Sequence, residues 1–245
     1  HYLEWLKLLI APGSSIGGAR PKAGVRDPKG DLWIAKFPGR SDTREMAAWE
    51  MLVHQLAVKA GLRVAEGALQ KFGGGHRTFM TRRFDRLQGS EGARRIHFAS
   101  AMTLLGRADG DDHLAGASYL ELVEFLARQG AEPASDLEEL WRRIVFSIAV
   151  RNTDDHLRNH GFLLMENGWS LSPAYDLNPD PDGTGLSLNI SETDNALSFD
   201  LALEVAPFFR LKRPSAEAIL REVRNAVGAW KEQANALGIA RTEQE

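Results

Sequence analysis

The sequence predicts an α/β (α+β) protein made of two lobes, a small β-rich lobe over residues 1–86 and a mostly helical lobe over residues 87–245. In the first segment, short apolar runs alternate with Gly-rich turns and one stretch has helical periodicity, which is typical of a small sheet with one helix. In the second segment, apolar residues recur three and four positions apart, as on the buried faces of helices. An Asn-Gly pair between two apolar runs adds a β-hairpin to the helical lobe.

Composition excludes several classes of protein. The 245 residues are 43% hydrophobic and 26% charged, which indicates a globular chain and not a disordered one. The net charge of -3 gives no electrostatic basis for direct nucleic-acid binding. The longest apolar run, residues 144–150, is far shorter than the roughly 20 residues that cross a bilayer, so we expect a soluble protein without membrane contact. The absence of cysteine excludes disulfides and agrees with a cytoplasmic location.

A Gly-rich stretch followed by basic residues is the first candidate for phosphate binding. It reads Ser14-Ser15-Ile16-Gly17-Gly18-Ala19-Arg20-Pro21-Lys22. Its two glycines allow backbone amides to approach a ligand closely, and successive amides form a concavity that binds anions. A Gly-Gly pair alone is more often only a turn, so the phosphate role depends on the residues that follow.

Lys36 is the next candidate for phosphate binding. It lies near the end of an apolar strand, residues 32–37, which follows the turn 27–30. A Gly-rich loop joined by a hairpin to a strand with one lysine is the arrangement with which the small lobe of a kinase holds nucleotide phosphates. The alternative is a strand-end lysine that extends its ammonium into water. The kinase interpretation therefore requires a carboxylate partner for Lys36.

A helix predicted over residues 43–60 offers that partner. Gly61 is a typical C-terminal stop for this helix. Glu50 lies beside the apolar face and can turn towards the sheet to pair with Lys36, whereas Glu45 is the rival candidate, and either glutamate could be solvated. We favour Glu50. The apolar face consists of residues three and four apart: Met46, Trp49, Val53, Leu56 and Ala60.

Strands are predicted over residues 62–69 and 77–86, on either side of three glycines at 73–75. The second strand leads into a hinge, where the backbone around Arg82 and Phe84 could hold an adenine edge. Further elements are a helix at 118–129 closed by Gly130, a helix through Ile148 opened by a Ser135/Glu138 capping box, a strand-like run at 186–190, and a last helix at 214–237.

The segment that carries the chemistry follows the helix through Ile148. It reads Asn152-Thr153-Asp154-Asp155-His156-Leu157-Arg158-Asn159, and an apolar hairpin and Asp176 come after it. An Asn-Gly hairpin turn, here at 167 and 168, requires positive φ at both positions. With this turn, residue 166 pairs with 169, and counting back along both strands places Asn159 opposite Asp176. Two oxygen ligands at the open end of the hairpin predict a divalent-ion site.

The spacing of three residues indicates which chemistry this ion serves. Mg²⁺ is usually held by one or two protein oxygens plus substrate phosphates. In protein kinases an Asp, an Asn five residues later and a further Asp act as base and two metal ligands. Asp154, Asn159 and Asp176 have this order and spacing. The plain alternative is that they cap turns. The copied tetrapeptide Asp111-Asp112-His113-Leu114 lacks the Asn and the hairpin, so we interpret it as a solvated loop.

Taken together, these stretches resemble the HipA family of serine/threonine kinase toxins. They follow one another in family order over most of the chain from residue 14 onward. The resemblance implies a bilobal protein-kinase-like fold that transfers the γ-phosphate of ATP with Mg²⁺. The matching stretches are 15–22, Ile34-Ala35-Lys36-Phe37-Pro38, Arg83-Phe84-Asp85-Arg86, 153–159, and Pro173-Ala174-Tyr175-Asp176-Leu177.

The resemblance also implies a role for each candidate residue. Asp154 would be the catalytic base, and Asn159 and Asp176 the Mg²⁺ ligands. Ser15, or its neighbour Ser14, would be autophosphorylated, which expels the Gly-rich loop and silences the enzyme because the new charge lies beside the ATP phosphates. The implied nucleotide contacts are Ser15, Gly17, Gly18, Ala19, Lys36, Glu50, Arg82, Phe84, His156, Arg158 and Asn159.

The chain also departs from the family pattern. Arg82, Asp155 and Arg158 stand where family members often have Glu, Gly and Lys. Longer members carry an extra N-terminal subdomain that is absent here, so we expect a short, HipT-like toxin whose missing piece is a separate small protein, or else a fragment. The start at His1, without Met or a signal-peptide pattern, agrees with a longer gene product. The family's partners are a DNA-binding HipB-type antitoxin and, as substrate, an aminoacyl-tRNA synthetase.

Three other functions remain open from the sequence. A catalytically silent nucleotide-binding module could share the fold, because fold does not fix activity. A small-molecule phosphotransferase would use the same ion site. A metallohydrolase would use Asp154, Asp155 and His156 as metal ligands and would assign no role to Lys36.

Overall fold

The computed structural model describes residues 21–39, 42–72, 76–87 and 94–245. They form two compact units. Of the described residues, unit 1 comprises 21–39, 42–54, 65–72, 76–87, 94–95 and 230–245, and unit 2 comprises 55–64 and 96–229. The predicted α/β class is confirmed, since one unit contains a small sheet and the other is mostly helical. The division into lobes after residue 86 stays a prediction. The Gly-rich loop with Ser14, Ser15, Gly17, Gly18 and Ala19 lies outside the described residues.

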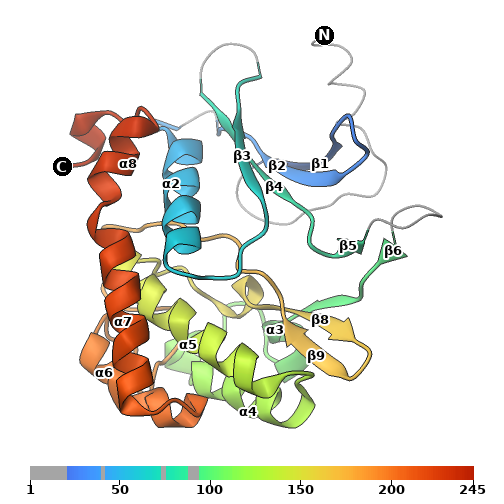
Figure 1. Ribbon diagram of the computed structural model, residues 1–245, viewed down its shortest axis with the longest axis vertical. Coiled ribbons are helices and arrows are strands. Elements are labelled where there is room, and N and C mark those ends of the chain that lie inside the picture. Colours follow the sequence, from blue (N-terminus) through green and yellow to red (C-terminus); the bar gives the residue numbers. More distant parts are fainter. Residues whose placement is uncertain (1–20, 40–41, 73–75, 88–93) are drawn as a thin grey trace. The chain divides into compact units, whose positions relative to one another are not determined.

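Unit 1 contains an antiparallel sheet of order β1-β2-β4-β3 (Figure 1). Alternate residues of a strand share a face, so Ala35 faces the buried cluster that contains Trp33 and Met80. Lys36 faces the opposite side of the sheet, where its Nζ lies 5.8 Å from the centre of the Phe79 ring. The strands are β1 (Lys22–Arg26), β2 (Leu32–Lys36), β3 (Gly67–Gln70) and β4 (Thr78–Arg82), and a short ribbon of β5 (Arg86–Leu87) and β6 (Arg94–Arg95) follows.

Helix α2 (Met46–Lys59) confirms the predicted helix and begins three residues later than expected. Gly61 follows with φ +78, the left-handed conformation that glycine adopts readily, as predicted for the stop. The ring of His54 lies 5.9 Å from that of Phe79. This part of α2 therefore covers the face of the sheet that carries Lys36.

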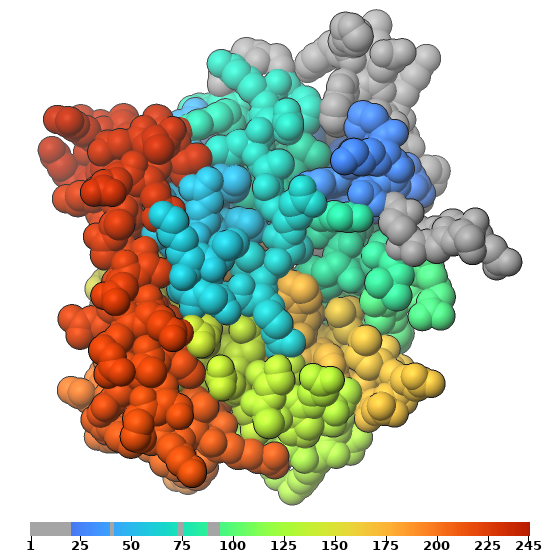
Figure 2. Space-filling view, in the orientation of Figure 1, coloured from blue at the N-terminus to red at the C-terminus, as the bar shows by residue number. Residues whose placement is uncertain are grey.

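The C-terminal residues of unit 1 pack against the start of α2 (Figure 2). Trp230, the first residue of α8 (Trp230–Ala236), lies with its ring 6.0 Å from that of Trp49. Glu243, in the 3₁₀ turn η4 (Arg241–Glu243), accepts hydrogen bonds from the Trp49 indole (3.0 Å) and the Glu45 amide (3.2 Å). Arg77 donates to the Leu237 carbonyl at 2.7 Å.

The single helix predicted over 214–237 is wrong. The chain forms α7 (Arg213–Gly228) in unit 2 and then α8 in unit 1, with Ala229 between them. Ile219 and Val223 of α7 are buried within unit 2, whereas Trp230 packs on Trp49. The apolar residues that recur at helical spacing over 214–237 therefore pack in two different cores, first that of unit 2 and then that of unit 1.

Unit 2 is built around α5 (Pro133–Val150), whose Trp141, Ile144, Val145 and Phe146 are fully buried. The Trp141 indole donates to the Ala202 carbonyl at 2.9 Å. The other helices are α3 (Ala101–Leu105), α4 (Tyr119–Gln129) and α6 (Phe199–Val205), and the 3₁₀ turns are η1 (His113–Ala115), η2 (Leu157–Asn159) and η3 (Ala206–Phe209). Within the described ranges, no helix has both the length and the apolar character that a bilayer crossing requires.

Two helix starts in unit 2 differ from each other in how they agree with the sequence. Helix α4 has its predicted range to within one residue, and it also has a capping box that was not predicted: Glu121 accepts a hydrogen bond from the backbone of the N-cap residue Ser118 at 3.1 Å. The capping box of Ser135 and Glu138 is wrong, because α5 begins at Pro133 and Ser135 lies inside its first turn. Proline is favoured in a first turn, where its missing N–H costs nothing.

The predicted hairpin exists, but its predicted register is wrong by two residues. It forms a sheet of order β7-β8-β9 from β7 (Phe98–Ser100), β8 (Gly161–Met165) and β9 (Gly168–Leu171). Met165 pairs with Gly168, so the turn is Glu166-Asn167. Gly168 instead permits a close approach to the end of α4: its φ is +137, and a Cβ there would lie 2.6 Å from the Gln129 carbonyl oxygen. The ladder ends at Phe162 and Leu171, and Asn159 and Asp176 are not paired in it.

Three predicted strands are shorter than expected or absent. The strand predicted at 62–69 begins only at Gly67, because the Leu62 amide still bonds to the helical Ala57 carbonyl and Val64 forms only an isolated bridge with Ala174. The strand predicted at 77–86 ends at Arg82. Residues 186–190 form no strand; they are tied by isolated bridges such as that between Ser118 and Asn189.

Candidate active site

Lys36 and Glu50 form a buried ion pair in unit 1, with each side chain 10% exposed. Glu45 has other partners: its carboxylate lies 2.9 Å from His76 Nδ1 and accepts a hydrogen bond from Arg77 Nε at 3.2 Å. Burial opposes ionisation of Glu45, but these two partners outweigh it and hold its pKa below the usual value. The prediction that Glu50, and not Glu45, pairs with Lys36 is confirmed, and Lys36 does not extend into water.

The hinge candidates lie at the end of β4. Arg82 is 42% exposed and its Nη2 lies 2.9 Å from Asp31 Oδ2. Phe84 is partly buried. Arg83 and Arg86 both bind the Asp85 carboxylate, and although burial opposes ionisation of Asp85, these guanidinium groups lower its pKa. The chain thus turns sharply after β4, and the adenine contact stays a prediction.

The loop of residues 152–159 in unit 2, called the catalytic loop here after its predicted role, follows directly on α5. Helix α5 ends at Val150, and the C-cap residue Arg151 has φ +55, the left-handed conformation in which helices commonly terminate. Asp154 then points outward with 80% of its side chain exposed, and its Oδ1 lies 3.8 Å from His156 Nε2. Asn159 is buried and donates from Nδ2 to the Asp154 carbonyl at 2.9 Å. The loop therefore presents one acidic side chain to solvent and fixes one amide behind it.

Asp155 points in the opposite direction, into the interior of unit 2. Its carboxylate accepts hydrogen bonds from the Tyr119 hydroxyl (2.6 Å) and the Ser147 hydroxyl (3.3 Å), and His160 Nε2 lies 3.1 Å away. Burial opposes ionisation, but His160 and the hydroxyl donors outweigh it and lower the pKa of Asp155. Burial and the neighbouring carboxylate raise the pKa of Tyr119 well above its usual value.

The metallohydrolase hypothesis is therefore wrong about its ligands. Asp154 and Asp155 diverge, so Asp154, Asp155 and His156 do not surround one point. In the part of the chain that the structure describes, no three His, Cys, Asp or Glu side chains form a cluster able to hold a metal ion. The Mg²⁺ site expected here consists of the Asn159 amide and the Asp176 carboxylate. It is therefore not a cluster of three such side chains, and the absence of such a cluster among the described residues does not bear on it.

The buried carboxylate of Asp155 predicts a particular pH dependence of stability. Because its folded-state pKa is lowered, its contribution is present above the unfolded value of about 3.9 and is lost as the pH falls through the folded value. We expect Asp155→Asn to lower the free energy of unfolding at pH 7 by about 2 kcal/mol, as for hydrogen bonds to a buried charge. The difference from the parent should shrink below pH 4. Urea unfolding between pH 7 and 3 measures it, and a constant difference would contradict this role.

The segment of Asp176 is tied to the catalytic loop by side chains. The Tyr175 hydroxyl donates to the Arg158 carbonyl at 2.7 Å, and the Asn178 amide donates to Asn152 Oδ1 at 3.2 Å. Asn178 Nδ2 lies 3.4 Å from Asp176 Oδ1. Asp176 has φ +59, a conformation that is uncommon for residues other than glycine and that clusters at functional sites. The residues preceding Asn159 and Asp176 are thus in contact.

Asn152 and Asn178 were missed by the sequence analysis as supports of this site. Asp180 was missed too; it accepts a hydrogen bond from the Thr153 hydroxyl at 2.7 Å. Only their positions in the sequence could have indicated these residues. Asn152 and Thr153 open the catalytic loop, and Asn178 and Asp180 follow Asp176 within four positions. Such spacing could suggest support, but it gives no direction for any side chain.

Arg158 pairs with Asp109, from the loop that precedes the copied tetrapeptide. In the copy, which was interpreted as a solvated loop, Asp111 accepts from the Ala108 amide (3.0 Å) and Asp112 from the Leu114 amide (2.8 Å), so both carboxylates cap turns and are only partly exposed. The loop is not remote, however. Together with the catalytic loop it lines a pocket of about 130 Å³, whose walls include residues 108–112 and 156–158, Met102 and Ser187.

A small antiparallel sheet with a buried Lys–Glu pair, and a helical unit with an exposed Asp, a buried Asn and a later Asp, define a protein of the kinase-like class. The family follows from a comparison with family models: residues 14–230 match the model described as the HipA-like C-terminal domain. The chain belongs to this family. The resemblance inferred from the sequence is therefore confirmed.

Relatives and solved structures agree with this assignment. The chain is 30% identical over 147 residues to "Putative kinase Y4mE" of Sinorhizobium fredii, covering 59% of this chain and 33% of that protein. It is 27% identical over 179 residues to a "Putative kinase" of Haemophilus influenzae, covering 67% of this chain and 52% of that protein. The chain thus spans about a third and about half of these two relatives.

Two solved structures share the fold. One is HipA of Shewanella oneidensis, in a complex with HipB and operator DNA, with a TM-score of 0.70 and 20% identity over 90% of this chain and 59% of that one. The other is the proinflammatory kinase CtkA of Helicobacter pylori, with a TM-score of 0.58 and 15% identity over 93% of this chain and 96% of that one. At these identities the likeness establishes the fold alone.

Proposed function

We propose that the chain is an ATP- and Mg²⁺-dependent serine/threonine protein kinase and acts as the toxin of a HipA-type toxin–antitoxin system. The observation that carries the proposal is the division of roles in the catalytic loop. The Asp154 side chain is 80% exposed, while its neighbour Asp155 is buried and accepts hydrogen bonds from the Tyr119 and Ser147 hydroxyls. An acidic side chain that the fold presents to solvent beside a buried Asn is what proton abstraction next to a metal ion requires.

The residues that would hold Mg²⁺ fit that ion. Asn159 and Asp176 offer an amide oxygen and a carboxylate, the hard oxygen ligands that Mg²⁺ prefers, with phosphates completing the coordination. The amide group of Asn159 is oriented because its Nδ2 donates to the Asp154 carbonyl, which turns Oδ1 to the other side. Asp176 is oriented in part by Asn178. When bound, the metal neutralises charge on the transferred phosphoryl group.

The chain's own side chains supply the remaining chemistry. Asp154 accepts the proton of the acceptor hydroxyl, and the oxygen of that hydroxyl forms a bond to the γ-phosphorus of ATP. The bond between the γ-phosphorus and the β–γ bridging oxygen breaks, which releases ADP. Lys36 donates to phosphate oxygens. Glu50 holds the Lys36 ammonium in place through the buried ion pair. His156 and Arg158 lie beside Asp154 and are proposed nucleotide contacts.

Incubation with labelled ATP and Mg²⁺ tests the proposal directly. Phosphate should appear on Ser15 or Ser14, since we propose that a serine of the Gly-rich loop is autophosphorylated. Bound nucleotide without incorporation would favour the silent module. Transfer to small hydroxyl compounds, but to no protein, would favour the small-molecule phosphotransferase.

We propose two kinds of protein partner for the chain. A HipB-type DNA-binding antitoxin is supported by the complex in which the Shewanella oneidensis HipA was solved. A protein substrate of the aminoacyl-tRNA synthetase class is proposed from the family resemblance. Co-purification with an antitoxin encoded beside the gene would support the first, and phosphorylation of a purified synthetase would support the second.

The backbone of Asp176 allows its carboxylate to be tested apart from its conformation. With φ at +59, a non-glycine residue such as Ala is strained by about 1 kcal/mol relative to Gly. We expect Asp176→Gly and Asp176→Ala both to lose metal-dependent transfer, while the Ala variant unfolds at lower urea than the Gly variant, which is free of this strain. Retained transfer in Asp176→Gly would exclude Asp176 as a metal ligand.

A further inference from the structure

Helix α5 carries a row of buried charged side chains that the proposed chemistry does not use. Asp136, Glu139 and Arg143 are 1%, 6% and 2% exposed, respectively. Their spacing of three and four places them on one face of the helix. Burying a charge is costly unless it is paired and hydrogen-bonded, and an apolar replacement for a buried ion pair is often no less stable. Stability alone is therefore a poor reason for this row of charges.

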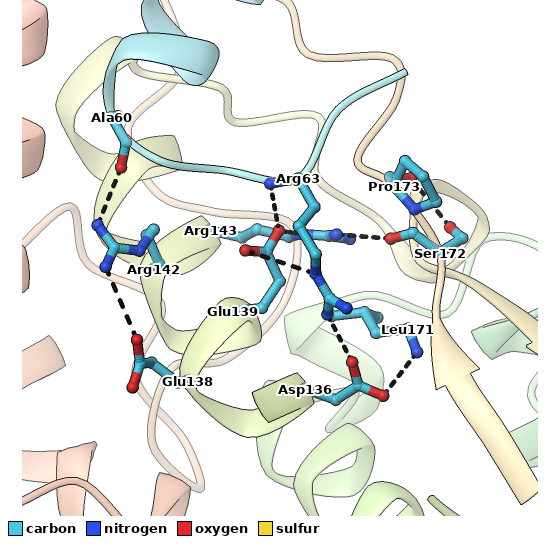
Figure 3. A network of polar contacts seen from close by, with 10 residues as sticks. All are labelled: Ala60, Arg63, Asp136, Glu138, Glu139, Arg142, Arg143, Leu171, Ser172 and Pro173. Atoms are coloured by element: carbon cyan, nitrogen blue, oxygen red, sulfur yellow. Dashed lines mark hydrogen bonds and ion pairs between the residues drawn. The ribbon is translucent and has the colours of Figure 1, made fainter. Parts of the chain in front are cut away.

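The row holds the backbone at the point where β9 ends (Figure 3). Asp136 Oδ2 accepts a hydrogen bond from the Leu171 amide at 2.9 Å, and Arg143 Nη2 donates to the Ser172 carbonyl at 2.6 Å. Leu171 and Ser172 are consecutive, so α5 binds a donor and an acceptor of one short stretch. Asp176 follows four residues after Ser172.

Arg63, which follows α2, closes the network from the other side (Figure 3). Its Nη2 donates to Asp136 Oδ1 at 2.5 Å and its amide donates to Glu139 Oε1 at 3.1 Å. Glu139 Oε1 also accepts from Arg143 Nε at 2.8 Å. The Arg63 carbonyl in turn accepts from the Ala174 amide at 2.7 Å. Ala174, two residues before Asp176, is thereby fixed as well.

The same helix thus controls both parts of the proposed centre in unit 2. Its last turn leads into the loop of Asp154, and its buried charged side chains hydrogen-bond the backbone of Leu171 and Ser172, which precede Asp176. Beyond Asp176, the Asn178 amide is bound by Asn152. The backbone is therefore held on both sides of the residue with φ +59, a conformation that persists only where its surroundings enforce it.

We propose that Asp136, Glu139, Arg143 and Arg63 are positioning residues of the metal centre. They fix the backbone of residues 171–174 so that the carboxylate of Asp176 is directed at the ion. The inference rests on the function proposed above, because it assumes that Asp176 binds metal. Outer partners that orient ligands in this way typically change metal affinity by roughly 10–100-fold when they are replaced.

Helix α5 supplies matched controls for a test. Asp136→Asn keeps the size of the side chain but cannot accept hydrogen bonds from both Leu171 and Arg63, and Arg143→Lys keeps the charge but cannot reach both Glu139 and Ser172. Glu138→Gln and Arg142→Lys are the controls. Arg142 binds the Ala60 carbonyl (3.0 Å) and Glu222 (2.7 Å), and neither control residue contacts the 171–174 backbone among the described residues.

Two measurements on the whole protein separate positioning from stability. Hydrogen exchange without any ligand reports on the amides of residues 171–176, with those of the hairpin tip as an internal reference. Electron paramagnetic resonance of Mn²⁺, titrated in the presence of a non-hydrolysable ATP analogue, reports metal affinity without turnover. In Asp136→Asn and Arg143→Lys we expect faster exchange confined to 171–176 and about 10-fold weaker Mn²⁺ binding. The two controls should match the parent in both.

Unchanged exchange and unchanged Mn²⁺ affinity in Asp136→Asn and Arg143→Lys would overturn the inference, even if their melting temperatures fell. Should one of these variants not fold, the other carries the test. A parent protein that binds no Mn²⁺ would defeat the proposed function, and with it the metal role of the network. Faster exchange limited to 171–176 would even then show that the charges fix this segment, so the two failures are distinguishable.

Discussion

Asp154→Ala is expected to lower phosphate transfer by about 10²–10⁴-fold, the usual contribution of a positioned general acid or base. The fold should be unaffected, because 80% of the side chain is exposed. Nucleotide and Mn²⁺ binding should likewise remain, since Asn159 and Asp176 are intact and the Asp154 carbonyl that orients Asn159 belongs to the backbone. Labelled-phosphate incorporation and a thermal melt measure these two expectations.

The copied tetrapeptide supplies the control for this experiment. Asp111 stands in the same four-residue context as Asp154, but its carboxylate caps a turn by accepting from the Ala108 amide. Asp111→Ala should lower phosphate transfer far less than Asp154→Ala, because the Asp111 carboxylate caps a turn and accepts no proton in the proposed mechanism. In cells, expression of the parent should stop growth and expression of Asp154→Ala should not. Equal activity of parent and Asp154→Ala would remove Asp154 from the mechanism.

Lys36→Met should lower transfer by about 10²–10³-fold, the typical loss when one preorganised donor to developing charge is removed. It should also lower the free energy of unfolding by about 3 kcal/mol, because the buried Glu50 loses the ammonium with which it pairs. The two losses have different origins. Transfer falls because a donor to the phosphates is missing, whereas stability falls because the buried Glu50 carboxylate no longer pairs with the Lys36 ammonium.

The double variant Lys36→Met/Glu50→Met separates these origins. Replacing both members of a buried pair by apolar residues of similar size is often neutral for stability, so the double variant should regain most of the lost unfolding free energy. It should not regain transfer. Urea unfolding and labelled-phosphate incorporation on the four proteins of this cycle measure both. Full transfer in Lys36→Met would contradict the kinase proposal, and a return of transfer in the double variant would mean that Lys36 acts only through stability.

Local patterns predicted much of the fold because they depend on neighbouring residues. The apolar stripe of α2 and its stop at Gly61, the helix after Ser118, and the strand with Lys36 all follow from spacing within one segment. The choice of Glu50 over Glu45 also succeeded, because only Glu50 lies beside the buried face of its helix.

Failures occurred where a distant segment decides the local geometry. The Asn-Gly pair predicted a turn that includes Gly168, but Gly168 is the first paired residue of β9, and the close Gln129 carbonyl leaves no room for a Cβ at this position. Ala229 interrupts a continuous helical pattern because Trp230 belongs to another core. Asp136, Glu139 and Arg143 were overlooked. Their common face was visible in the spacing, but their partners are backbone groups that no sequence pattern identifies.

The packing of residues 230–243 on Trp49 and Glu45 sets an order of events during synthesis. All of unit 2 precedes residue 230 in the chain. The contacts of Trp230 and Glu243 with Trp49 therefore form only after every residue of unit 2 has been synthesised, so the Lys36-bearing unit cannot complete this part of its packing before then.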